Sequence, residues 1–397
     1  MKKLIGIKIL PILLILSILI SLTSCMAFWV EQVGYDKMFE YTEVEGGYEI
    51  KGTPMVGVAM MSKKNFENMI LEIPSEYNGQ PIVAIAEDGF SGNPYLNKVI
   101  IPDTVKVIGN RAFSDCITLC ECNIPSSVSI IGDAAFMNCP YLDVEIPEGV
   151  TTIGVEAFYY TMVYNEEGLF PETFDFMIDT SIFVRTELKE MKIPSTVTSI
   201  GEGAFARSTL IVGFDVDENN PMYQSINGVL YTKDGKTLLQ YPLASKLTNC
   251  DVLDSVENIA NYAFAEGNYL ETINISENSN LKRVGDFAFK SCDVLESLTF
   301  PSTLESIGEE AIAYCSKLAT CYINGSDVTF GDKLWEYSSS LKDLYYGGTI
   351  SQMKQYLDTQ NFGYFMSGSC NIHCSNGSFT FSNGSYIFVP IVPSSTN

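Results

Sequence analysis

The sequence predicts a β-rich solenoid made of turns of about 23 residues, with short helical turns and a cap at each end. An Ile-Gly-x-x-Ala-Phe element recurs, and the steps between successive copies are 23, 23, 22, 47, 59, 25 and 23 residues. A short alternation of apolar and polar residues precedes most copies and ends in proline. No single copy holds enough apolar side chains to fold alone, so the copies must stack. The last residue of the element is Phe90, Phe113, Phe136, Phe158, Phe205, Phe264, Phe289 and, in the eighth copy, Ile312.

Residues 1–24 are predicted to be a signal peptide that precedes the fold. Lysines at positions 2, 3 and 8 come before or at the edge of an apolar run of about fourteen residues, which is short for a membrane span and suits a signal-peptide core. The run ends in Leu22-Thr23-Ser24-Cys25, which resembles a bacterial lipobox. This predicts cleavage before Cys25 and lipid attachment to it, which would hold the protein on a bacterial membrane. An ordinary secretory signal and an uncleaved anchor are the alternatives.

Residues 25–69 are predicted to form an N-terminal β-rich cap. Its clearest element is the stretch Tyr41–Ile50, in which two β-prone segments flank the pair Gly46-Gly47. We expect a hairpin there, because a cap must shield the open end of a stacked array.

Each repeat begins with an inward-facing strand. In Leu96-x-x-Val99-x-Ile101-Pro102 the apolar residues alternate with polar ones, and the proline ends the strand because it cannot donate to a ladder. A second short strand follows, and Ala112-Phe113 is expected on a short helical turn that fills the core. The same inward triplet occurs at Leu119/Cys122/Ile124, Leu188/Met191/Ile193, Leu270/Ile273/Ile275, Leu295/Leu298/Phe300 and Leu318/Cys321/Ile323.

These motifs resemble the BspA-type leucine-rich repeat family of bacterial surface proteins. The resemblance covers residues 70–346, with insertions at 159–187 and 211–250, and the first insertion carries no repeat signal. Residues 347–397 resemble the C-terminal end of such proteins and are predicted to be a second cap. The resemblance implies a leucine-rich-repeat solenoid and a cell-surface or secreted location, and some members of the family are adhesins. It does not identify a ligand.

The composition limits the partners. The formal net charge is −24, and it becomes −27 without the signal peptide, which carries three lysines and no acidic residue. Such a negative charge disfavours binding to nucleic acid and to other anionic polymers. We therefore expect a neutral or basic partner, either an extracellular protein or a glycan.

The cysteines are predicted to be core thiols. Cys116, Cys139, Cys292 and Cys315 each lie three residues after the core-filling position, a place that accepts a small apolar group. Disulfides between neighbouring repeats are the alternative, but parallel side chains give poor disulfide geometry. Inward strand positions are held by Cys122 and Cys321, while Cys120 and Cys250 are left open.

Sequence motifs for catalysis or metal binding are weak. Cys370-Asn371-Ile372-His373-Cys374 holds metal-binding residue types, but on a strand the cysteines and the histidine point to opposite faces, which favours a capping strand over a zinc site. His373 is the only histidine. The acidic stretch Asp215–Asn220 lacks the glycine of a calcium loop. We expect no cofactor, no metal and a protein that is not an enzyme.

The outward strand positions are the candidate ligand surface. In the N-terminal half of the array they are mostly charged, and in the C-terminal half they carry hydroxyl, amide and tyrosine side chains suited to protein or glycan contacts. The alternatives are a solvated sheet face in a structural envelope protein without a discrete ligand and, more remotely, a carbohydrate-active enzyme. The predicted binding residues are Thr272, Asn274, Ser297, Thr299, Thr320, Tyr322, Asp343 and Tyr345.

Overall fold

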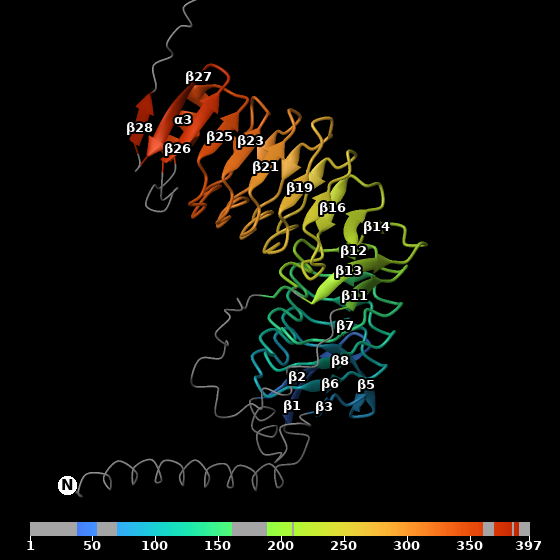
Figure 1. The fold of residues 1–397 in the computed structure, drawn as a ribbon. Coiled ribbons are helices and arrows are strands. Elements are labelled where there is room, and N and C mark those ends of the chain that lie inside the picture. Colours follow the sequence, from blue (N-terminus) through green and yellow to red (C-terminus); the bar gives the residue numbers. More distant parts are fainter. Residues whose placement is uncertain are drawn as a thin grey trace, which may run out of the picture. The chain divides into compact units, whose positions relative to one another are not determined.

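The computed structural model describes residues 38–53, 70–160, 189–208, 210–359, 369–382 and 385–388 (Figure 1). The predicted signal peptide, Cys25 and nearly all of the insertion 159–187 lie outside these ranges. The chain divides into two compact units, Met1–Thr186 and Glu187–Asn397. Within the described ranges, no helix has the length and apolar character needed to cross a membrane.

The first unit stacks its repeats in two parallel rows of strands. The first strand of each repeat forms the row β3-β6-β8, and the second forms the row β5-β7-β9-β10. The predicted hairpin is present: β1 and β2 pair antiparallel, and β2 then adds to β5 in parallel. The strands are β1 (Phe39–Val44), β2 (Gly47–Gly52), β3 (Ile70–Glu72), β4 (Glu76–Tyr77), β5 (Gln80–Ile85), β6 (Lys98–Ile100), β7 (Val107–Ile108), β8 (Glu121–Asn123), β9 (Ile130–Ile131) and β10 (Thr152–Ile153).

The second unit stacks its own repeats in the same way and ends in an antiparallel cap. Second strands of successive repeats form β16-β18-β20-β22-β24, and first strands form β21-β23-β25, on which the cap strands β26-β27-β28 are added. The elements are β11 (Lys189–Ile193), β12 (Ser199–Ile200), β13 (Ile211–Val216), β14 (Tyr223–Ile226), β15 (Val229–Thr232), β16 (Thr237–Gln240), β17 (Asn249–Asp251), β18 (Asn258–Ile259), β19 (Thr272–Asn274), β20 (Arg283–Val284), β21 (Ser297–Phe300), β22 (Ser306–Ile307), β23 (Thr320–Ile323), β24 (Thr329–Phe330), β25 (Asp343–Tyr346), α3 (Ile350–Thr359), β26 (Ser369–Cys374), β27 (Gly377–Ser382) and β28 (Ser385–Phe388).

The predicted insertion 211–250 differs from the structure at both of its ends. β13 pairs in parallel with β11, and β17 pairs in parallel with β19, so both strands belong to the stacked rows. Between them, β14 and β15 depart from the repeat: they form an antiparallel meander with β16, which itself pairs in parallel with β18. The repeat signal at β17 is weak because Cys250 and Val252 replace the usual larger aliphatic residues.

Within the core, one large side chain per turn stacks on its equivalent in the next turn. The rings of Phe90, Phe113, Phe136 and Phe158 lie 5.5, 5.3 and 5.4 Å apart in sequence order, with planes within 10°. Phe264 and Phe289 stack in the second unit at 5.2 Å. Ile312 and then Trp335 take the same place in later turns, and both are fully buried. The predicted core-filling positions are therefore confirmed.

The segment expected to be a short helical turn is a run of tight turns. Arg111 and Asp115, which flank Phe113, have φ values of 52° and 59°, in the left-handed region. A helix cannot continue through such residues, so the chain reverses twice and each core ring points inward. The backbone N–H of Phe113 donates to the carbonyl of Ala135 in the next repeat at 2.8 Å, so these tight turns also hydrogen-bond from repeat to repeat.

The cysteine thiols form a ladder of hydrogen bonds. Cys116 Sγ donates to the carbonyl of Phe90 at 3.3 Å, one turn back, and the equivalent bonds of Cys139, Cys292 and Cys315 measure 3.1, 3.3 and 3.1 Å. Ser338 takes the place in the next turn and donates to the carbonyl of Ile312 at 2.7 Å. All ten cysteines in the described ranges are free, including Cys120 and Cys250. The prediction of core thiols is confirmed, because a small donor is needed there to pair a buried carbonyl.

Candidate ligand-binding face

The strand register of the second unit arranges the predicted residues in two columns. Across β21, β23 and β25, one column contains Ser297, Thr320 and Asp343, and the other contains Thr299, Tyr322 and Tyr345. Figure 1 shows β21, β23 and β25 as neighbouring strands. Their parallel pairing is in register, so equivalent side chains stand side by side on the outward face. The inward residues Leu298, Cys321 and Leu344 are buried, which fixes the direction of the outward ones.

Three rings form what we call the aromatic row: Tyr322, Tyr345 and His373. Tyr322 and Tyr345 stack with centroids 4.6 Å apart and planes within 11°. His373 stacks on the other side of Tyr345 at 4.5 Å. The two tyrosines keep 37% and 36% of their surface exposed. The row therefore presents ring edges to solvent along its length.

Polar contacts hold His373 in place. Its Nδ1 lies 3.1 Å from Ser378 Oγ and its Nε2 lies 3.4 Å from Asp343 Oδ1. Asn371, its neighbour on β26, donates from Nδ2 to the same Asp343 oxygen at 3.1 Å. Both ring nitrogens are thus engaged, and the imidazole cannot turn away from Tyr345 without losing these contacts.

β26 is a capping strand, as predicted for residues 370–374. Cys370 is buried and His373 faces outward, so the two side chains lie on opposite faces of the sheet. The strand pairs in parallel with β25 and antiparallel with β27. The described residues include no cluster of three His, Cys, Asp or Glu side chains that could hold a metal ion.

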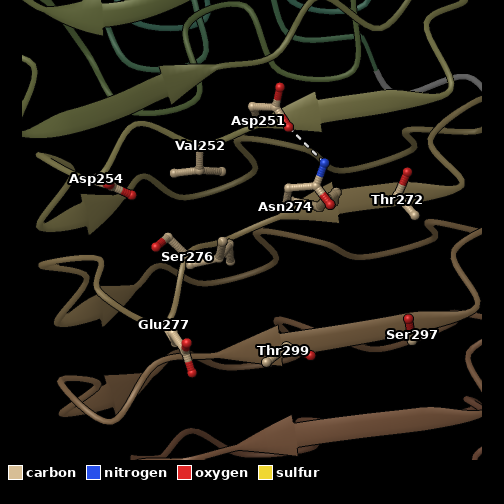
Figure 2. Close-up of a pocket in the computed structure, with 11 residues that line it drawn as sticks. Asp251, Val252, Asp254, Thr272, Asn274, Ser276, Glu277, Ser297 and Thr299 are labelled. Carbon is tan, nitrogen blue, oxygen red and sulfur yellow. Dashed lines mark hydrogen bonds between the residues drawn. The ribbon is translucent and has the colours of Figure 1, made fainter.

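Next to the aromatic row lies what we call the polar groove, an open hollow of about 590 Å³ (Figure 2). Four predicted residues line it: Thr272, Asn274, Ser297 and Thr299. Asn274 Nδ2 donates to Asp251 Oδ1 at 2.6 Å, which orients both side chains. The remaining lining residues are Asp251, Val252, Asp254, Ile273, Ile275, Ser276 and Glu277.

The sequence reasoning missed several members of this face. Asp251 was passed over because its strand was assigned to an insertion, although Cys250, Val252, Val256 and Ile259 repeat the inward spacing of other turns. His373 was placed outward on its strand, but its stacking on Tyr345 was not predicted. Asp254 and Glu277 lie in loops after β17 and β19, where strand periodicity gives no orientation.

Comparison with solved structures finds bacterial leucine-rich repeat proteins. A leucine-rich repeat protein from Eubacterium ventriosum is 20% identical, with 79% of this chain and 77% of that chain covered and a TM-score of 0.52. One from Bacteroides ovatus is 25% identical, with 78% and 70% covered and a TM-score of 0.50. The pneumococcal vaccine antigen PcpA is 18% identical, with 79% and 80% covered and a TM-score of 0.52.

These similarities concern the fold. A comparison with curated protein sequences gave no match. The pattern described as the BspA type leucine rich repeat region matches in six copies over residues 83–212 and 241–361, which is more than half of the chain. The matched ranges include the repeats that carry the polar groove and most of the aromatic row. The chain therefore belongs to the BspA-type leucine-rich repeat family.

Proposed function

We propose that this protein is a lipid-anchored bacterial cell-surface protein that binds an extracellular protein or glycan with the outward strand face of its second unit. The observation that carries the proposal is the exposed aromatic row beside the polar groove. A solvated sheet face with no ligand needs no exposed rings, and burying them would release apolar surface from water. Repeat solenoids commonly use such an extended face for binding.

The surface location is supported by two independent features. The sequence Leu22-Thr23-Ser24-Cys25 follows an apolar leader and resembles a lipobox, and the chain belongs to a family of bacterial leucine-rich repeat proteins. A lipid on Cys25 would tether the repeats to the membrane and leave the strand face free for contacts. The acidic composition fits partners that are neutral or basic.

The test is a binding panel with the chain from Met26 to Asn397. Extracellular-matrix proteins, host cells and glycans are compared for saturable binding to this chain and to its Tyr322→Ala, Tyr345→Ala double variant. We expect at least one saturable interaction that the double variant loses, with unchanged circular dichroism. Binding that is equal in both proteins would place the ligand elsewhere.

The panel also separates the competing functions. A structural envelope protein would bind nothing on the panel, while deletion of its gene would weaken the envelope. A carbohydrate-active enzyme would convert a glycan with turnover and would lose that turnover on substitution of a single carboxylate. The proposed function predicts neither result.

A further inference from the structure

We propose that the ligand of this face is an uncharged oligosaccharide, which lies in the polar groove with one sugar ring against the free face of Tyr322. This inference rests on the proposed function, because it names the class of ligand for the same face. It adds a role for Asp251 and for the Tyr322 ring that the repeat fold alone does not imply.

Tyr322 has one ring face covered and one ring face free. Its stacked partner Tyr345 lies on the β25 side, 4.6 Å from it. On the other side the residue paired with Tyr322 is Thr299, which is exposed. A threonine side chain is too short to cover a phenol ring, so the outer part of that ring face is open. The flat aliphatic face of a pyranose ring can pack there as any planar apolar group would.

The polar groove begins where this ring face ends. Thr299 and Ser297 form its near edge, and it continues over Thr272 and Asn274 to Asp251. Figure 2 shows Asp254, Ser276 and Glu277 along one side of the groove and Thr272 and Ser297 along the other. The groove spans two strand intervals, from β17 to β21, and Tyr322 on β23 extends the proposed site to three intervals, which is about 14 Å. This length suits a short oligosaccharide better than a single sugar.

The lining matches the hydrogen-bonding chemistry of sugar hydroxyl groups. Carboxylates accept only, the Asn274 amide both donates and accepts, and serine or threonine hydroxyls do either. A sugar hydroxyl donates one bond and accepts others, so it can pair with every group in this set. The bond from Asn274 to Asp251 already holds two of these side chains in fixed orientations, which lowers the entropy cost of binding.

Charge selects among the oligosaccharides. Asp251, Asp254 and Glu277 face the groove, and within the described residues none of them forms an ion pair with a lysine or arginine. A sulfated or sialylated chain would bring its negative charges next to these carboxylates. The groove therefore discriminates against anionic glycans and accepts neutral ones.

The test uses the full-length chain, purified with detergent present, on an array of neutral, sialylated and sulfated oligosaccharides. We expect saturable binding to a neutral oligosaccharide, little changed between about 50 and about 500 mM salt. Calorimetry with the array hit should show binding weakened about tenfold in Tyr322→Ala and in Asn274→Ala. Tyr322→Phe keeps the ring and should retain most of the affinity.

Tyr314→Ala is the matched control. Tyr314 is 38% exposed and contacts another tyrosine ring, that of Tyr337, at 4.8 Å with the planes tilted by 31°, but it lies in a turn and not on an outward strand position. Its substitution should leave binding unchanged, and melting curves of all variants exclude unfolding as the cause of a loss.

Four outcomes would overturn the inference. Preference for anionic glycans, or equal loss in Tyr314→Ala and Tyr322→Ala, contradicts the site as described. If a matrix protein binds in a Tyr322-dependent way and no glycan binds, the proposed function is retained and only the inference of a glycan ligand is wrong. If no ligand binds on either panel, both the proposed function and the inference of a glycan ligand are wrong.

Discussion

The imidazole ring of His373 lies on the phenol ring of Tyr345, with centroids 4.5 Å apart and planes inclined by 14°. This contact joins the C-terminal cap to the last repeat, because the in-register pairing of β25 with β26 places the two residues opposite each other. Tyr345 thus has a ring on each face, whereas Tyr322 has a ring on one face only.

Substitution of these two tyrosines should therefore destabilise the second unit unequally. Each ring pair is worth about 0.5–1.5 kcal/mol beyond simple area burial, so Tyr345→Ala removes two such terms and Tyr322→Ala one. We expect a lower urea midpoint for Tyr345→Ala than for Tyr322→Ala. Equal midpoints would mean that the His373 contact contributes nothing to stability.

The buried thiols should make the protein sensitive to alkaline pH. Burial raises the pKa of Cys315 from the ordinary 9.0 to about 12. The folded state therefore holds this proton more tightly than the unfolded state, and the resulting stability is fully present below pH 9 and is lost as the pH rises from 9 to 12. The expected loss is about 1.4 kcal/mol per pH unit for each such thiol.

Urea denaturation at pH 8, 9 and 10 measures this effect, with Cys315→Ala as the comparison. The variant loses the hydrogen bond to Phe289 at every pH, so its stability is lower throughout. Its free energy of unfolding should nevertheless fall less steeply with pH, because the contribution of one thiol is missing. Parallel pH profiles for the two proteins would show that Cys315 ionises as freely in the folded state as in the unfolded one.

Gly331 should not tolerate alanine. A Cβ at this position would lie 2.3 Å from the backbone N of Glu309 and 2.3 Å from the carbonyl carbon of Gly308, in the preceding turn. Backbone cannot yield as a side chain can, so we expect Gly331→Ala to reduce the free energy of unfolding by about 1–3 kcal/mol, as is typical of overpacking, and so to lower the melting temperature. Gly213→Ala is the control, because its nearest neighbour is a side-chain atom at 3.6 Å. Similar melting temperatures for the two variants would contradict this account of turn stacking.

The lipid anchor can be tested at Cys25, which lies outside the described residues. In a bacterial host, the wild-type chain should incorporate labelled fatty acid and fractionate with membranes. The Cys25→Ala variant should take up no label and leave the membrane fraction once its leader is cleaved. A wild-type chain that takes up no label and stays uncleaved in the membrane fraction would point instead to a leader that remains in place as the anchor.

The sequence predicts most of the fold because the same pattern of strand and turn residues recurs in several repeats. Each inward triplet, such as Leu295, Leu298 and Phe300, combines strand periodicity with a proline that ends the strand. The turns around Phe113 were harder, because the left-handed φ of Arg111 falls on a residue type with no preference for that conformation. The signal is clearer at Asp115, because Gly92 and Asn138, which favour positive φ, hold the same place in neighbouring turns.

The candidate site was only partly predictable for a related reason. Outward positions follow from strand parity, so Tyr322 and Tyr345 could be identified from their neighbours in the chain. The pairing of His373 with Tyr345 could not, because α3 and the following residues separate β25 from β26 and break the repeat spacing. Which loop side chains border the groove depends on loop conformation, which the period does not fix.

The thiol ladder has a consequence for how the chain can reach its fold. The ten described cysteines are free, and in four turns the thiol supplies a hydrogen bond that Ser338 supplies in another. Oxygen and sulfur donors are thus interchangeable at this position. Because the described residues contain no disulfide, the folding of this part of the chain requires no disulfide-forming step.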